Sequence, residues 1–495
     1  KASQQALSYG ANQEAVEFFD RVLAVDRQSE TNSDSLARAR WERQLGEAYL
    51  ALNQLAESRN HLERAVTLLG RPQPDSQLRL LTSLTEQVLV QTLHRLGSAK
   101  FDRRSPDAES AREVVRTYER LASIYLLTND KRMLVNASLH ALNLAENCGT
   151  PFDIARAYAE SCVAAGAIPL HPVAEAYQRQ ALAKARALER CPSQAWVLEI
   201  SGRYGLGVGQ WTQAEAALEE AAEIADSLKD QRRRGECLDL LGSMACYRGQ
   251  FEHSATLFVE AYASLCQRGN AEYLQAALLG RAQSLLRLGQ TEQAFTLLET
   301  VQQSPAESPG LPTEIWIYGL LSLVHLRRGD QLQAHRSARM GVQLIGHSPP
   351  NALYLLEAYA DVAEVYLALW NANGGLSRAE RSTLVKSVRD TCRALHDFAR
   401  AFPIGQPRAW VFQGLYDWHA GQTGKAHKAW QKGLAQAERL EMPYEEGLAH
   451  YEIGRHLPFD DPQQEKHLTR ACELFARLEA RHDLKQARES LATRN

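Results

Sequence analysis

At 495 residues, the chain is long enough for two to four globular domains or for one extended repeat array. Hydrophobic residues make up 45% and charged residues 23%, which excludes wholesale disorder. The 56 lysines and arginines nearly balance the 59 acidic residues, giving a formal net charge of −3 that argues against a general nucleic-acid binder. No run reaches about 18 consecutive apolar residues, so no membrane span is predicted.

The first residues and the cysteines indicate in which compartment the protein is found. The start, KASQQALSYG, lacks the apolar core of a signal peptide. The eight cysteines form no C-x-x-C pair, and most lie in apolar helical patterns. Such cysteines are typical of buried, reduced thiols rather than of disulfides or a zinc site. We therefore expect a cytoplasmic protein.

Helix-forming residues dominate the whole chain. Alanine, leucine, glutamate, glutamine and arginine are frequent, and apolar residues return every three or four positions, as in SLARARWERQLGEAYLAL. Short alternating runs rich in valine, isoleucine and threonine are missing. The pattern predicts an all-α protein built from amphipathic helices.

The N-terminal part predicts helical pairs. Lys1 falls within a first helix whose turn is at Gly10, so half a repeat is missing upstream and the chain reads as part of a longer one. A fuller pair is centred on Asn53, a weaker copy turns at Asn129, and another begins at Ala159 and Gly166, with its second helix after the insert AIPLHP.

The middle of the chain contains the clearest repeat. Gly209, Gly249, Gly289 and Gly329 are each 40 residues apart, and small or apolar residues recur at fixed offsets around them. Seven residues before each glycine stand Gly202, Gly242, Ala282 and Ser322, and five residues after it stand Ala214, Ser254, Ala294 and Ala334. Nine residues after it stand Leu218, Phe258, Leu298 and Ala338. Twelve residues after it stand Ala221, Ala261, Val301 and Gly341. A small residue in one helix and one packed face on the next predict a helical hairpin with a glycine turn.

The C-terminal part repeats the pattern and then ends it. Trp410, Gly414, Gly421, Ala426, Trp430 and Gly433 form the last full copy. Polar or proline-rich interruptions at 98–107, 302–313 and 372–377 are where we expect the array to bend. Residues 482–495 have no partner helix after them and are expected to form a capping helix.

These offsets resemble the tetratricopeptide repeat (TPR), whose pattern W-x2-L-G-x2-Y is partly present in Leu45, Gly46 and Tyr49. A period of 40 exceeds the usual 34 or so and is nearer to HEAT-type pairs, but the internal offsets favour the TPR. The resemblance implies one TPR-like α-α superhelix over 1–495, with about ten hairpins and a groove lined by the first helices.

One stretch suggests nucleotide chemistry. GQTGKA (421–426) looks like a phosphate-binding loop, but His419 stands where a Walker A motif needs its first glycine, and Ala426 replaces the hydroxyl residue. A hairpin turn with a solvent-facing Lys425 explains the stretch better. The glycines of GRYGLGVGQ (202–210) likewise fail G-x-G-x-x-G and have packing and turn roles.

No constellation of catalytic or metal-binding residues stands out. His450 and His456 are six residues apart and point away from each other on a helix, while His419 and His427 flank a turn and could meet. We predict no catalytic, cofactor-binding or metal-ligating residues, and no cofactor. The basic clusters 103–104, 232–234 and 327–328 are interpreted as solvated turns and helix ends, with a local site for an acidic partner as the alternative.

Longer segments carry a second resemblance. ERLASIYLLTNDKRMLVNASLHALNLAE, AIPLHPVAEAYQRQAL, FPIGQPRAWVFQGLYDW and MPYEEGLAHYEIGRHLP look like the C-terminal TPR-rich region of bacterial multidomain signalling proteins. In those proteins a class III adenylate/guanylate cyclase or kinase module and an AAA/STAND-type ATPase precede the repeats. The resemblance implies a non-enzymatic regulatory module that binds a protein or peptide, or the upstream domains of its own polypeptide. The alternatives are a free-standing scaffold and, less favoured, a nucleotide-binding enzyme.

Overall fold

The structure of the chain is a computed structural model. It describes residues 12–28, 34–52, 54–96, 108–268, 271–303, 310–347, 350–372 and 378–492. Within these ranges the regular secondary structure is helical, without a β-strand. The all-α prediction is therefore confirmed.

The helices follow one another in antiparallel pairs. The N-terminal helices are α2 (Asn12–Gln28), α3 (Ser35–Ala51), α4 (Leu55–Leu68), α5 (Gln77–Arg95), α6 (Ala108–Leu127), α7 (Lys131–Cys148), α8 (Pro151–Ala167), α9 (His171–Arg186), α10 (Pro192–Val208) and α11 (Trp211–Ser227). They are followed by α12 (Gln231–Tyr247), α13 (Phe251–Arg268), α14 (Ala271–Arg287), α15 (Thr291–Gln303), α16 (Leu311–Arg327), α17 (Gln331–Ile345), α18 (Leu355–Ala372), α19 (Arg378–Ala401), α20 (Gln406–His419), α21 (Thr423–Arg439), α22 (Pro443–His456), α23 (Pro462–Arg477) and α24 (Arg481–Ala492). From α6 to α22 each even-numbered helix is the first of a hairpin, and α3/α4 is an earlier pair.

The turns between paired helices have the backbone conformation that the glycines predict. Gly209, Gly249, Gly289, Gly329 and Gly421 all have φ between 74° and 82°. This left-handed region is strained for residues with a Cβ atom. Asn129, the turn residue of the weaker copy, has φ of 57°, and asparagine tolerates this region better than most residues.

The paired helices approach closely at the small residues. A Cβ atom on Gly202 would lie 2.7 Å from Cγ of Leu218, and one on Gly414 would lie 2.3 Å from Nε1 of Trp430. Ser254 donates a hydrogen bond of 2.7 Å from its hydroxyl to the carbonyl of Gly242. The residues five, nine and twelve positions after each repeat glycine are buried. The interpretation of these offsets as hairpin packing is confirmed.

One repeat differs from its expected form. Gly166 lies inside α8 rather than in the turn, and α9 already begins at His171 within the expected insert. The turn therefore spans only residues 168–170, because α8 extends past the glycine. Gly10 and Asn53, the expected turn residues of the first two copies, lie outside the described residues.

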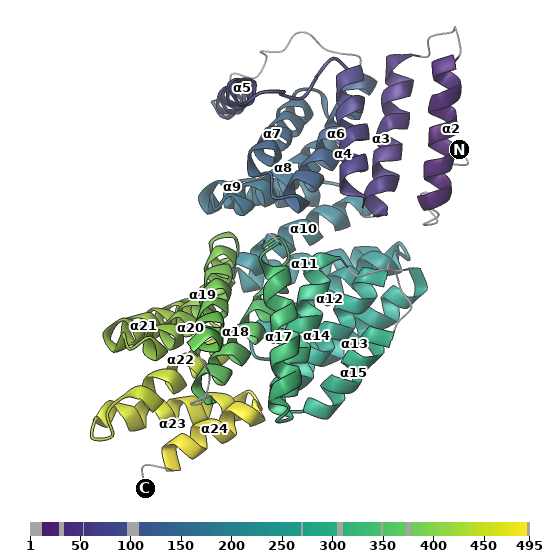
Figure 1. Cartoon of the computed structure of the whole chain (residues 1–495). Helices are drawn as coiled ribbons and strands as arrows, with labels where there is room; N and C mark the ends of the chain where they lie inside the picture. Colours follow the sequence, from purple (N-terminus) through teal and green to yellow (C-terminus); the bar gives the residue numbers. More distant parts are fainter. Residues whose placement is uncertain are drawn as a thin grey trace. The chain divides into compact units, whose positions relative to one another are not determined.

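The chain divides into two compact units, unit 1 (Lys1–Ser201) and unit 2 (Gly202–Asn495). Within each unit the helices stack in chain order (Figure 1). The expected bend at 98–107 lies outside the described residues, as do residues 304–309 of the one at 302–313 and residues 373–377 of the one at 372–377. The single continuous solenoid stays a prediction.

Two helices stand outside the hairpin pattern. α24 packs against α23 and ends the described chain, at the place where a cap is expected. α5 lies between two hairpins in the sequence and packs on α7, at the edge of unit 1 (Figure 1). The described helices include none that is long and apolar enough to cross a membrane.

Replacing Gly414 with alanine tests the close approach of α20 and α21. The added methyl group would meet the fully buried ring of Trp430, so we expect a loss of about 1–3 kcal/mol in the free energy of unfolding. Gly424, on an open helical face with nothing within 4 Å, is the control. At position 424 alanine should leave the free energy of unfolding unchanged or raise it by at most about 1 kcal/mol. Urea unfolding measures both, and equal effects would contradict the packing argument.

Candidate functional site

The stretch that resembles a phosphate-binding loop is a hairpin turn. Gly421 has φ of 78° between α20 and α21, and Lys425 is exposed in the first turn of α21. The element before the turn is a helix, whereas a phosphate-binding loop follows a strand. The glycines of 202–208 lie within α10, and Gly209 forms the next turn. Both sequence interpretations are confirmed.

The histidines near this turn pack against aromatic rings. His419 stacks on Trp370 with ring centroids 5.3 Å apart, while His427 meets the edge of Trp430 at 5.2 Å. His456 stacks on Trp430 at 4.7 Å, and burial, followed by Arg455, lowers its pKa to about 3. A buried neutral imidazole is what this apolar packing requires. Among the described residues, no three His, Cys, Asp or Glu side chains are grouped to hold a metal ion.

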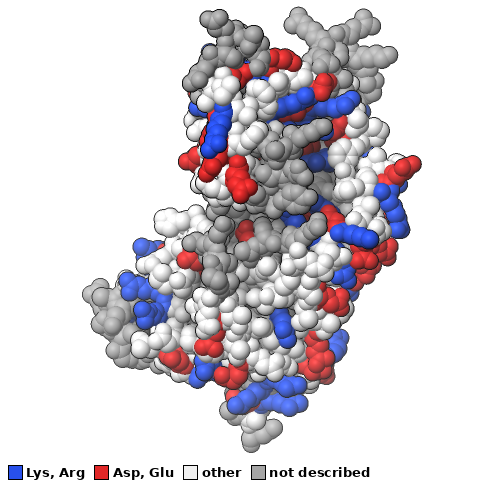
Figure 2. Space-filling view, turned by 90° about the vertical axis from the view of Figure 1, so that its right-hand side faces the viewer, with Lys and Arg blue, Asp and Glu red and all other residues white. Residues whose placement is uncertain are grey.

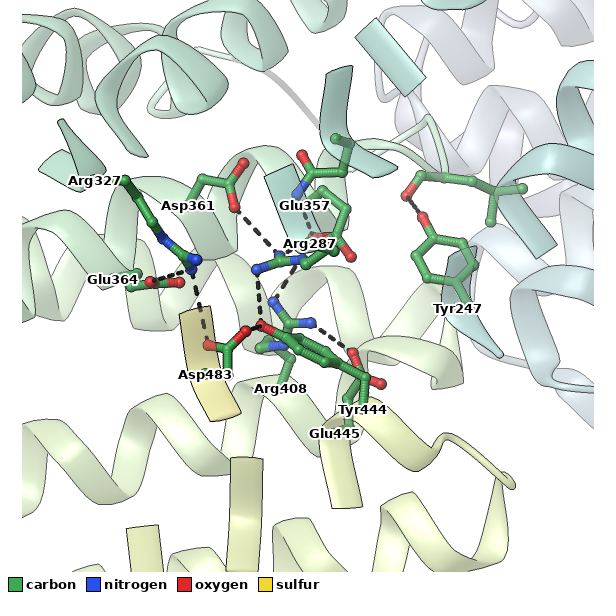
Figure 3. A network of polar contacts seen from close by, with 12 residues as sticks. Tyr247, Arg287, Arg327, Glu357, Asp361, Glu364, Arg408, Tyr444, Glu445 and Asp483 are labelled. Carbon is green, nitrogen blue, oxygen red and sulfur yellow. Dashed lines mark hydrogen bonds and ion pairs between the residues drawn. The ribbon is translucent and has the colours of Figure 1, made fainter. Parts of the chain in front are cut away.

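The first helices of unit 2 meet in a buried network of charged side chains (Figure 3). We call it the ionic hub. It consists of Arg287 (α14), Arg327 (α16), Glu357, Asp361 and Glu364 (α18), Arg408 (α20), Tyr444 and Glu445 (α22) and Asp483 (α24). Every contributing helix is the first of its hairpin or the cap. The sequence predicts that these helices line a binding groove, but here their facing side chains bind one another.

The arginines connect helices that are far apart in the sequence. Arg287 Nη2 lies 2.5 Å from Glu357 Oε2 on α18, and its Nη1 donates to the Tyr444 hydroxyl on α22 at 3.0 Å. Arg408 Nη2 lies 2.6 Å from Glu445 Oε1.

A second branch of the hub reaches the cap. Arg327 Nη2 lies 3.2 Å from Glu364 Oε1 and 3.9 Å from Asp483 Oδ1. The Tyr444 hydroxyl donates to Asp483 Oδ2 at 3.3 Å. The two branches therefore join the cap to helices α14, α16, α18 and α22.

Helix ends favour the positions of these charges. Arg287 and Arg327 are the last residues of α14 and α16, where the helix dipole stabilises a cation. Glu357, Glu445 and Asp483 lie in the first turns of their helices, where it stabilises an anion. The hub thus joins helix C-termini to N-termini through paired charges.

The hub contains more carboxyl groups than guanidinium groups, and proton binding reduces the imbalance. Burial opposes ionisation of Glu357, but Arg287 and Arg408 outweigh it and lower its pKa. Burial raises the pKa of Asp361 to about 8, against the opposing effect of Arg287. Burial also raises the pKa of Glu445. The raised pKa of Asp361 favours its protonated form in the folded chain.

The hub corrects one sequence interpretation. Arg327 was expected on a solvated helix end, but its side chain is only 3% exposed and is paired with two carboxylates. Its neighbour Arg328 reaches Glu292 at 3.1 Å and covers the ring of Phe295. In the 232–234 cluster, Arg232 pairs with Glu236 at 2.8 Å on the helix surface. The cluster 103–104 lies outside the described residues.

The hub leaves little free volume beside it. A cavity next to Glu357, lined by Tyr247, Gln283, Trp316 and Tyr354, measures about 20 Å³. This is room for a single water molecule. This cavity is too small for a peptide, and we interpret the ionic hub as a structural closure of unit 2.

Unit 1 contains a groove large enough for a ligand. The groove measures about 680 Å³ and lies among α2, α3 and α4. Leu23 and Asp26 belong to one wall, and Glu63, Arg64 and Leu68 of α4 belong to the other. Arg38 and Glu42 of α3 lie between them. We call it the α2–α4 groove, and its volume is in the range of small-molecule and short-peptide sites.

Ion pairs hold the acidic groups of the α2–α4 groove in place. Asp26 is buried and pairs with Arg38. Glu42 is also buried, and its Oε2 lies 2.6 Å from Nδ1 of His61.

On the α4 wall, Glu63 pairs with Arg59 at 2.7 Å and accepts from the Tyr125 hydroxyl at 3.0 Å. Fixed polar groups of this kind can orient a ligand without first being ordered. The groove thus presents polar groups that are already positioned.

The surface carries mixed charge. On the face shown in Figure 2, Lys and Arg side chains alternate with Asp and Glu, and uncharged surface lies between them. This pattern agrees with the near-neutral composition. It differs from the continuous basic stripe of most nucleic-acid binders.

Removing one partner from the ionic hub should destabilise the chain strongly. Arg408→Met leaves Glu445 buried without its cation, so we expect a loss of about 3–5 kcal/mol in the free energy of unfolding. Arg470→Met breaks an exposed pair with Glu446 and should change it by less than about 1 kcal/mol. Urea unfolding compares the two. A mild effect of Arg408→Met would show that the hub does not close unit 2.

The raised pKa of Asp361 predicts a pH dependence. The folded chain holds this proton up to about pH 8, whereas an unfolded aspartate releases it near pH 4. The stabilisation is therefore complete below about pH 4 and is lost as the pH rises towards 8. Between pH 6 and 7.5 the free energy of unfolding of the unchanged chain should fall as the pH rises. In Asp361→Asn this fall should be smaller by about 1 kcal/mol per pH unit. Parallel pH profiles of the two chains would refute the protonated state.

Comparisons with known proteins find likeness in structure only. No protein-family model matches the chain, and no curated protein matches its sequence. A Rap protein complexed with Competence and Sporulation Factor has a TM-score of 0.47 and 11% identity, over 79% of this chain and all of that one. Aspartyl phosphate phosphatase F from Bacillus subtilis has a TM-score of 0.43 and 13% identity, over 83% of this chain and 97% of that one. A human IFIT1 dimer with PPP-AAAA has a TM-score of 0.43 and 14% identity, over 82% of this chain and 84% of that one. At these values the function has to be argued from the residues.

Proposed function

We propose that this chain is a binding module of helical hairpins, and that the α2–α4 groove holds a short polar segment of a protein partner. The observation that carries the proposal is the contrast between the two units. In unit 2 the charged side chains of the ionic hub bind one another, whereas unit 1 contains a groove of about 680 Å³.

The groove walls supply both kinds of contact that a peptide needs. Arg64 and Thr67 are exposed polar residues on α4, and Leu68, 37% exposed, adds an apolar contact. Arg64 forms no ion pair within the described residues, so its guanidinium is available to a partner's carboxylate or carbonyl. The buried pairs below, such as Asp26 with Arg38, keep the groove rigid.

The groove also differs from the site expected from the repeat. The sequence predicts recognition along the first helices, but α4 is the second helix of its pair, and α2 occupies the position that the repeat predicts for a second helix. Only α3, which lies between the walls, is a first helix. A partner would therefore lie between successive second helices.

In its finer form the proposal follows the resemblance to multidomain signalling proteins. The chain would then be the regulatory arm of a larger signalling ATPase or nucleotide cyclase, restraining an effector until a partner binds. Such control requires the partner to bind the restrained and released states with different affinity. The partner would bind in the α2–α4 groove, and the effector would be the ATPase or cyclase that the resemblance implies.

Peptide selection tests the groove. Random peptides displayed on phage are selected on the whole chain, and the affinity of the enriched peptides is measured by fluorescence anisotropy. The double variant Arg64→Glu/Leu68→Glu reverses a wall charge and removes an apolar contact, so we expect at least a tenfold weaker affinity, about 1.4 kcal/mol.

Lys425→Glu is the matched control, because it reverses an exposed charge in unit 2. It should leave the affinity unchanged. If the selected peptides bind all three chains equally, the groove is not their site, and the proposal is wrong.

The size of the native polypeptide tests the regulatory role. An antibody raised against this chain is used to detect the protein in an extract of its source on a denaturing gel. We expect a band much larger than 55.3 kDa, because the resemblance implies upstream domains. A band near 55 kDa would instead support the free-standing scaffold.

A further inference from the structure

Helix α5 is oriented with its polar side chains inward. It is 19 residues long and packs on α7, outside the hairpin pattern. Gln87 and Gln91 are its buried residues, whereas three of its leucines, a valine and the C-cap residue Leu96 are exposed. Surface helices normally show the reverse arrangement.

Hydrogen bonds to α7 fix this orientation. The amide of Asn143 donates to the backbone carbonyl of Gln87 at 2.9 Å, and Gln91 donates to Asn143 Oδ1 at 2.8 Å. Nδ1 of His94 lies 2.6 Å from Glu146 Oε2. Rotating α5 to bury its leucines would break these bonds and leave polar groups unpaired inside unit 1.

The outward face is an uncharged strip along the helix. We call it the α5 strip. It contains Leu78, Leu81, Thr82, Thr85, Val88, Leu89, Thr92 and Leu96, which recur every three or four residues and therefore share one side. Its leucines and valine are 52% to 78% exposed. Such a continuous apolar surface is typical of an interaction site.

We propose that the α5 strip binds the same strip on a second copy of this chain, with the two helices antiparallel. A two-fold contact needs a surface that is complementary to itself. An uncharged strip of leucine, valine and threonine meets that requirement, since no charge is buried when two copies pack together.

The charges beside the strip set the register. Arg79 and Glu86 lie on the same edge of α5, seven residues or about 10 Å apart along the axis. In an antiparallel pair with the two-fold axis between Thr82 and Ser83, Arg79 of each copy faces Glu86 of the other. Arg79 also reaches Asp75 in its own chain at 2.6 Å, while Glu86 is exposed and forms no ion pair within the described residues. In this register Glu86 gains a cationic partner from the second copy.

The contact is small, which makes the dimer weak. In this register the helices overlap over 77–88, with a footprint of about 18 by 10 Å. Stable interfaces bury about 800 Å² per partner. Leu89, Thr92 and Leu96 of the strip lie beyond the overlap. The strip therefore supports reversible association at high concentration and not a permanent dimer.

Analytical ultracentrifugation of the full chain over a wide concentration range tests the proposal. The wild-type chain should pass from monomer to dimer as its concentration rises. Leu81→Gln/Val88→Gln should weaken the dimer at least tenfold, because both side chains face the second copy. Leu332→Gln, at a position 75% exposed in unit 2, should leave association unchanged. Circular dichroism confirms that each variant is folded.

Charge reversal tests the register. Glu86→Arg alone and Arg79→Glu alone each place like charges opposite one another and should weaken the dimer. The double variant Arg79→Glu/Glu86→Arg restores opposite charges and should recover much of the association. A chain that stays monomeric at every concentration, a dimer insensitive to the α5 variants, or a double variant no better than the singles would overturn the proposal. None of these outcomes depends on the α2–α4 groove.

Discussion

The close approach of two helices at a small residue is the constraint on which the rest of the structure depends. Glycine or another small residue in the first helix admits a large side chain from the second, as Gly414 admits Trp430 and Gly202 admits Leu218. Each hairpin formed in this way packs against the next. The successive first helices then present their remaining side chains to one another, and in both units some of these side chains form ion pairs between hairpins.

In unit 2 the presented side chains are arginines and carboxylates that pair across several hairpins. Buried ion pairs contribute little net stability, since desolvation offsets much of their attraction. Their value here is specificity, because Arg287 finds its partners only when α14, α18 and α22 are correctly placed. In unit 1 ion pairs also join different hairpins, as between the buried side chains of Arg43 on α3 and Glu113 on α6, but a groove stays open beside Asp26 and Arg38. We therefore propose that unit 1 carries recognition and that the ionic hub closes unit 2.

The hairpins could be predicted from the sequence, whereas the ionic hub and the groove could not. Turn glycines and packed positions such as Phe258 obey local spacing rules, and so they are visible without a structure. Arg327 was misjudged because its partners Glu364 and Asp483 are 37 and 156 residues away, and no local pattern connects them. The polar face of α5 could have been noticed, since Gln87 and Gln91 are one helical turn apart, but only the contacts to α7 show which side is buried.

Hydrogen exchange followed by mass spectrometry, with and without a selected peptide, tests the division of roles most directly. The account predicts that peptide binding slows amide exchange in α2, α3 and α4. It also predicts that α14, α18 and α22 exchange slowly whether or not the peptide is present, because the ionic hub already holds them. Peptide-dependent protection confined to α14, α18 and α22, with none in α2 to α4, would contradict the account and place recognition inside unit 2.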